Sequence, residues 1–116
     1  MQISIIKEND KNEQRVASTP DSIKLLKKFC AQILVESNSG DLSGYNDNAF
    51  ILAGAEIADR AKCLKADICL CVRMPSKQDI NQMNHGSILI GTLNPYENYD
   101  CFEELKKIKL LLVVWN

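Results

Sequence analysis

Apolar residues along the chain gather in short runs that are separated by polar stretches and turn-forming residues. Such runs, rich in Ile, Leu and Val and bounded by turn residues, predict β-strands. The run from Ile68 to Val72 is continuously apolar, as is typical of a strand that is covered on both faces. The predicted strands are residues 3–6, 33–35, 68–72, 87–93 and 110–115, with a brief extended piece at 55–57.

Helical spacing appears between these strands. Thr19 is a good N-cap and Pro20 suits the first helical position, so a helix is expected to begin there. Its apolar stripe consists of Ile23, Leu25, Leu26 and Phe29, with Lys24, Lys27 and Lys28 outside it. Further helices are predicted at residues 48–53, at 59–64, from Pro75-Ser76 to His85-Gly86, and at 98–107.

Strands and helices alternate along the chain, and several strands are apolar throughout. This pattern predicts an α/β fold with an open, doubly wound and mainly parallel sheet and helices on both faces, flavodoxin-like, in a single subdomain over residues 1–116. Function in such sheets lies at the carboxyl ends of the strands. Those ends are residues 7–15, 36–45, 73–76 and 94–99, of which 7–15 (KENDKNEQR) is expected to be an exposed polar loop.

The composition of the chain argues against several classes of function. The 116 residues carry a formal net charge of −1, so a broad basic surface for nucleic acid is not expected. The longest apolar run is far shorter than the roughly 20 residues of a membrane-spanning helix. The apolar start at Ile3–Ile6 runs directly into charged residues, unlike a signal peptide. We therefore expect a soluble, cytoplasmic protein.

Motifs for metal or nucleotide binding are missing from the sequence. The five cysteines include no C-x-x-C, and Cys69 and Cys71 are interpreted as small buried side chains on one face of a strand. The five glycines never take the G-x-G-x-x-G spacing, and no phosphate-binding G-x-x-x-x-G-K-[ST] occurs. No metal, no catalytic residue and no cofactor-binding residue is predicted in this chain.

Two arginines are candidates for anion binding. Arg15 follows the first loop and precedes a helix, where a guanidinium can grip a carboxylate or a phosphate. Arg73 lies at the end of a central strand, inside the expected crevice. For both, a solvated surface cation is the competing interpretation, and the only histidine, His85, is interpreted as a helix-end residue.

The opening of the chain resembles the alanine dehydrogenase/pyridine nucleotide transhydrogenase family. The specific part is N-E-x-R-V-A-x-T-P at residues 12–20, after ISIIKE at 3–8. The resemblance continues through VESNSG at 35–40, YNDNAF at 45–50, AGAEI at 53–57, Ala66-Asp67-Ile68, Val72 with Pro75, and His85-Gly86. It covers essentially the whole chain and favours the transhydrogenase alpha subunit over the alanine dehydrogenases.

Three positions decide between these two branches. Arg15 matches the arginine that holds the substrate carboxylate in alanine dehydrogenases. Their substrate lysine falls at Arg73 and their substrate histidine at Asn94, so chemistry on pyruvate or alanine is not expected. Arg15, Arg73 and Asn94 remain the candidate residues for a substrate or other anion.

The resemblance implies a part of a larger enzyme, because the family's NAD(H)-binding unit also contains a Rossmann subdomain. The intact enzyme would transfer hydride from NADH to NADP+, coupled to proton translocation. We expect this chain to be inactive and coenzyme-free alone, with the remaining alpha and beta subunit parts as partners at the inner face of the membrane. Self-association through the last strand is also expected. Two alternatives stay open, namely an alanine dehydrogenase-like substrate half and a non-catalytic protein-binding module.

Overall fold

A parallel β-sheet forms the centre of the computed structural model, which describes residues 1–9, 13–29, 32–91 and 111–114. The strand order in this part of the chain is β3-β2-β1-β4-β5-β6, and every neighbouring pair is parallel. Without the short edge strand β3, the other five strands have the order 2-1-3-4-5 of flavodoxin-like sheets. The strands are β1 (Gln2–Ile5), β2 (Gln32–Glu36), β3 (Glu56–Ala58), β4 (Ile68–Leu70), β5 (Ile88–Gly91) and β6 (Leu111–Val114).

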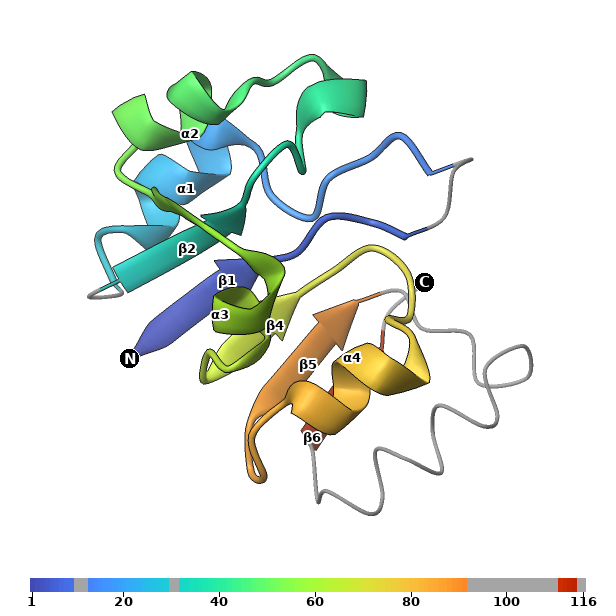
Figure 1. Cartoon of the computed structure of the whole chain (residues 1–116). Coiled ribbons are helices and arrows are strands. Elements are labelled where there is room, and N and C mark those ends of the chain that lie inside the picture. The colour runs from blue at the N-terminus through green and yellow to red at the C-terminus, as the bar shows by residue number, and fades with distance from the viewer. Residues whose placement is uncertain (10–12, 30–31, 92–110, 115–116) are drawn as a thin grey trace.

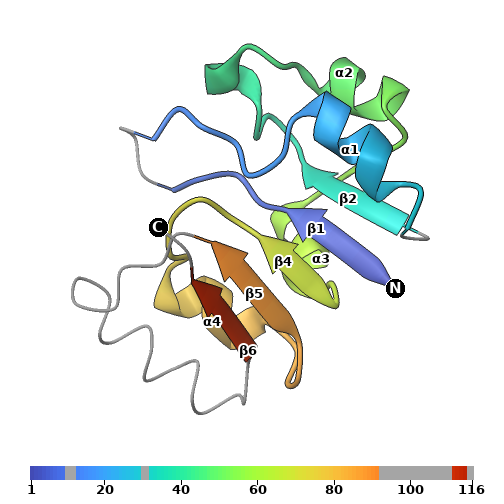
Figure 2. The ribbon, with the colours of Figure 1, turned by 180° about the vertical axis from the view of Figure 1, so that it is seen from behind.

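Helices cover both faces of this sheet. Helices α1 (Pro20–Leu26) and α2 (Asp47–Leu52) lie on one face, and α3 (Arg60–Leu64) and α4 (Lys77–Gln82) lie on the other, as Figures 1 and 2 show. A short 3₁₀ helix, η1 (Asp41–Ser43), precedes α2. The predicted doubly wound α/β fold is therefore confirmed. The helix predicted at residues 98–107 lies outside the described residues.

Side-chain caps begin the four α-helices. Thr19 accepts a hydrogen bond from the backbone N–H of Ser22, and Pro20 occupies the first turn, as predicted. Asn46, Asp59 and Ser76 play the same part for the other three helices. These caps satisfy N–H groups that a helix leaves unpaired at its start.

Strand alternation divides the core into two layers. Ile5, Ile33 and Val35 face α1 and α2, where Ile23 and Phe50 complete the layer. On the other face, the members are Ile6, Leu34, Cys63, Leu64, Cys69, Cys71, Ile80, Met83 and Leu89. The sequence analysis placed Cys69 and Cys71 together as buried side chains, and the structure confirms this.

The buried thiols are expected to be unreactive. Burial raises the pKa of Cys69 to about 11 and that of Cys63 to about 12, and it raises the pKa of Cys71 as well. A thiol in that state is a poor nucleophile and a poor metal ligand. No group of three or more His, Cys, Asp or Glu residues suited to a metal occurs in the described part of the chain.

Two predicted helices are too long. Helix α1 ends at Leu26, so Phe29 lies beyond it and is 82% exposed. Leu25 is 60% exposed because it is two positions from the buried Ile23 and therefore points to nearly the opposite side of the helix. Helix α4 ends at Gln82, well before Gly86. Met83 leaves the helical conformation there and its side chain enters the core, while Gly86 takes a left-handed φ of 80° in the turn before β5.

Gly40 allows the chain to pass closely over Phe50. A Cβ at Gly40 would lie 2.6 Å from Phe50 Cε2 and 2.7 Å from the backbone oxygen of Tyr45. At Gly44, whose φ is 87°, a Cβ would meet nothing within 4 Å. The two glycines are thus required for different reasons.

We expect Gly40→Ala to lower the free energy of unfolding by about 2–3 kcal/mol, because a rigid backbone oxygen and a buried ring must both move. Gly44→Ala carries only the cost of a left-handed residue, about 1 kcal/mol. Urea unfolding followed by circular dichroism measures both. Equal losses at the two positions would contradict the close approach at Gly40.

Candidate functional site at the switch point of the sheet

The chain changes direction across the sheet between β1 and β4. After β1 it moves to β2 on one side, and it later returns to place β4 on the other side of β1. The connections therefore diverge at the carboxyl ends of β1 and β4, which is where doubly wound folds form a binding crevice. The polar loop after β1 and the segment around Arg73 after β4 meet at this point.

Glu13 joins the loop after β1 to the segment after β4. Its side chain is only 4% exposed. Oε2 accepts hydrogen bonds from Nε and the backbone N–H of Arg15, at 2.9 and 3.0 Å, and Oε1 accepts one from Nη2 of Arg15, at 2.9 Å. Arg73 donates from Nε to the same Oε1 at 2.8 Å. The expectation that residues 7–15 form an exposed loop was therefore wrong at Glu13.

Glu8 fixes the other half of the junction. Its carboxylate accepts the backbone N–H groups of Val72 and Arg73, at 2.9 and 2.8 Å. One carboxylate from the loop thus holds the backbone of Arg73 and another holds its side chain. A third contact, in which the Ser43 hydroxyl donates to the carbonyl oxygen of Gln14, fixes the loop from the side of η1.

The pKa values of Glu13 and Glu8 are shifted in opposite directions by these surroundings. Hydrogen bonds from the Arg15 side chain, which outweigh the effect of burial, lower the pKa of Glu13 to about 2. Burial raises the pKa of Glu8, although the two backbone N–H groups oppose that shift. Glu13 is therefore firmly ionised at neutral pH because its partners are cations.

A second ion-pair network lies beside the first. Arg60, at the start of α3, donates to Glu36 at 2.7 Å, to Asp79 at 2.6 Å and to the backbone oxygen of Lys7 at 3.0 Å. Burial opposes ionisation of Asp79, but hydrogen bonds from Arg60 and Asn9 outweigh it and lower its pKa. This network joins β2, α3, α4 and the loop after β1, and we interpret it as structural.

Two of the three candidate anion-binding residues come together in the structure. Arg15 and Arg73 share Glu13, and their side chains are 67% and 51% exposed. Asn94 lies outside the described residues. Glu13 was not among the candidates, although its place two residues before Arg15 was a usable signal, because neighbouring unlike charges in a loop can pair.

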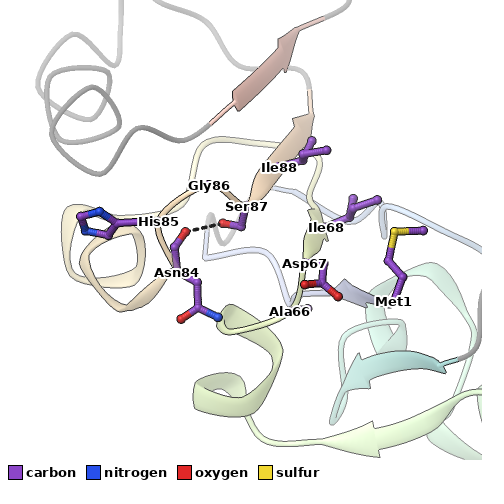
Figure 3. Close-up of a pocket in the computed structure, with 9 residues that line it drawn as sticks. All are labelled: Met1, Ala66, Asp67, Ile68, Asn84, His85, Gly86, Ser87 and Ile88. Atoms are coloured by element: carbon purple, nitrogen blue, oxygen red, sulfur yellow. Dashed lines mark hydrogen bonds between the residues drawn. The ribbon is translucent and has the colours of Figure 1, made fainter.

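A small pocket of about 190 Å³ lies at the opposite end of the strands, where β1, β4 and β5 begin (Figure 3). Three of its polar side chains or backbone groups have partners within the chain. Asp67 accepts the backbone N–H of Gln2, Asn84 donates to the backbone oxygen of Lys65, and Ser87 donates to that of Asn84. The exposed His85 ring points away from Asp67, so the pocket offers no acid–base pair.

Comparison with known proteins agrees with this architecture. Residues 4–114 match the family described as alanine dehydrogenase/PNT, N-terminal domain. The chain belongs to this family. The match runs from the second half of β1 to the end of β6 and includes both candidate arginines. It confirms the resemblance seen in the residues around Arg15.

Transhydrogenases are prominent among the similar proteins of this family. The chain is 33% identical over 113 residues to NAD(P) transhydrogenase subunit alpha of Haemophilus influenzae, a match that takes in 96% of this chain and 22% of that protein. It is 25% identical over 108 residues to alanine dehydrogenase 1 of Staphylococcus aureus, taking in 93% and 29%. The crystal structure of a transhydrogenase from Sinorhizobium meliloti superposes with a TM-score of 0.93, at 32% identity, over 98% of this chain and 34% of that one.

The chain thus spans about a fifth of the length of the Haemophilus subunit. In the part of the chain that the structure describes, no helix is both long enough and apolar enough to cross a bilayer.

The low pKa of Glu13 makes stability depend on pH. Its carboxyl titrates near 2 in the folded chain and at its usual 4.5 when unfolded, so its ionised form stabilises the fold above pH 4.5. That contribution is lost as the pH falls from 4.5 towards 2. Glu8 acts in the opposite sense, because its raised pKa favours the folded state at low pH and this contribution is lost as the pH rises through that value.

We therefore expect Glu13→Gln to flatten the acid side of the curve of unfolding free energy against pH, and Glu8→Gln not to do so. Urea unfolding at a series of pH values between 2 and 6 measures the slope. An unchanged slope in Glu13→Gln would show that the carboxylate is not held by the arginines in solution.

Proposed function

We propose that this chain serves as the N-terminal domain of an NAD(P) transhydrogenase alpha subunit and is not catalytic alone. The single observation that carries this proposal is 33% identity to such a subunit over 96% of the chain, against 25% for the alanine dehydrogenase. In the complete complex, the remaining alpha and beta subunit parts would transfer hydride from NADH to NADP+. Proton translocation would be coupled to that transfer in the membrane part.

The coenzymes NAD(H) and NADP(H) are assigned to the rest of the complex. The five glycines of this chain never take the dinucleotide-binding spacing, and a pyrophosphate needs such a close backbone approach in a Rossmann turn. We therefore place the Rossmann subdomain outside residues 1–116. The role left to this domain is to form one wall of the crevice in which the coenzyme reacts.

The crevice residues Arg15 and Arg73 are proposed to hold a small anion, with Asn94 as a third candidate. Two guanidinium groups that are more than half exposed lie at one buried carboxylate. Arginine presents several N–H donors in a plane, which suits a carboxylate or a phosphate group. The proximity of Arg15 and Arg73 supports this proposal.

An alanine dehydrogenase-like substrate half is the second candidate function. Arg15 favours it, since it matches the arginine expected to hold a substrate carboxylate. Arg73 and Asn94 disfavour it, since they stand where a lysine and a histidine are expected. A non-catalytic module that binds another protein is the remaining alternative.

Association with other chains follows from the same proposal. β6 is an edge strand of the described sheet, and an edge presents unpaired backbone groups. We propose docking to partner subunits at the cytoplasmic, inner face of the membrane, and self-association of the isolated chain.

A chimaeric subunit tests the proposed function. In the Haemophilus subunit alpha, the region that matches this chain is replaced by residues 1–116, and hydride transfer from NADH to NADP+ is measured in the assembled enzyme. We expect transfer to be restored relative to the subunit without that region. Reductive amination of pyruvate by the same chimaera would favour the alanine dehydrogenase alternative, and neither activity would favour the binding module.

Arg15→Ala tests the anion site in the chain itself. We expect the affinity for pyruvate and for inorganic phosphate to fall at least about tenfold, because one of two charged, planar donors is removed. Stability should fall as well, since the buried Glu13 loses two side-chain donors. Lys62→Ala, which removes an exposed cation from α3, is the control, and affinity unchanged by Arg15→Ala would remove Arg15 from the site.

A further inference from the structure

The carboxylate of Glu13 accepts four hydrogen bonds, which is about as many as a carboxylate can accept. Each oxygen accepts two bonds, and the donors are Nε, Nη2 and the backbone N–H of Arg15 and Nε of Arg73. A carboxylate has about four lone-pair positions, so none remains for a ligand. Glu13 therefore faces inward and acts on its two arginines, while the ligand-facing donors belong to those arginines.

The geometry of the Arg15 pair leaves part of its guanidinium outside the pair. Arg15 meets Glu13 side-on, through Nε and Nη2, which leaves the Nη1 edge out of the contact. The side chain of Arg15 is 67% exposed while that of Glu13 is 4% exposed, so Arg15 points its remaining edge towards solvent. The carboxylate fixes the plane and direction of that edge.

Two guanidiniums beside each other repel unless an anion lies between them. Glu13 supplies that anion from within the chain, since its Oε1 receives both Nη2 of Arg15 and Nε of Arg73. Arg15 follows β1 and Arg73 follows β4, so this one oxygen joins the two sides of the switch point. The pairing holds the two arginines close together, and it leaves the Nη1 group of Arg15 outside the contact with Glu13.

We propose that Glu13 is a positioning residue that holds Arg15 and Arg73 together as one anion-binding unit. The proposal rests on the anion site given under the proposed function. The ligand class is a small oxyanion, either a carboxylate or a phosphate group, that takes donors from both arginines. Glu13 does not touch this ligand.

Glu13→Gln should weaken anion binding if Glu13 positions the arginines, and should strengthen it if Glu13 acts only through its charge. Glu13→Gln removes one negative charge beside the site, which by Coulomb attraction alone would strengthen anion binding. Loss of positioning weakens it, because a neutral amide presents one acceptor oxygen where the carboxylate presents two. Glu36→Gln is the matched control, since Glu36 is a half-buried carboxylate that pairs with Arg60 in the neighbouring network.

The experiment uses the 116-residue chain labelled with ¹⁵N. Arginine Nε–H resonances are recorded by NMR while sodium pyruvate or inorganic phosphate is added at constant ionic strength. In the wild-type chain, we expect the Nε–H signals of Arg15 and Arg73 to be protected from exchange and to shift together with one dissociation constant. In Glu13→Gln, both signals should lose protection and the dissociation constant should rise at least about fivefold.

Each outcome decides one part of the proposal. Equal or tighter anion binding by Glu13→Gln, or weakening of the same size in Glu36→Gln, overturns the role of Glu13 and leaves the anion site standing. Failure of both anions to bind the wild-type chain overturns the anion site and this inference with it. Hydride transfer by the chimaera is independent of these results, so the proposed function is judged separately.

Discussion

Two carboxylates from the loop after β1 bind the segment that follows β4. The arrangement of this end of the molecule depends on that interaction. Glu8 accepts backbone N–H groups of Val72 and Arg73, and Glu13 accepts the side chain of Arg73. Neighbouring parallel strands are connected by long crossovers, so the loops that follow β1 and β4 are far apart in the sequence. Contacts between side chains and backbone hold these loops together where the crossovers diverge. Without these contacts, the segment around Arg73 would lose both carboxylates that tie it to the loop after β1.

This constraint explains why the site combines a buried carboxylate with arginines that are more than half exposed. Glu13 is almost fully buried and Arg15 is mostly exposed, although they are only two residues apart. A buried carboxylate is tolerated when charged donors surround it, and here those donors are arginines. The same contacts fix the loops and bring two guanidinium groups together at one carboxylate, and the proposed anion site is built on that pairing.

The relatives of this chain in the family are much longer proteins. The chain is similar to about a fifth of a transhydrogenase alpha subunit, and its sheet superposes closely on a transhydrogenase structure. A domain without a glycine-rich phosphate turn can still shape the reaction if its crevice faces a coenzyme held elsewhere. The neighbouring Arg60 network links β2, α3 and α4 to the loop after β1.

Local patterns in the sequence determined the strands, the helix starts and the parallel topology. Thr19 with Pro20 marked the start of α1, and the apolar run at Ile68–Val72 marked the central strand, because capping and strand burial depend on residues close together in the chain. Only the tertiary structure decided the end of α4, where Met83 leaves the helix to fill the core. It also decided that Glu13 is buried, because its partner Arg73 lies sixty positions away, and pairing over that separation follows from the strand order and not from local sequence.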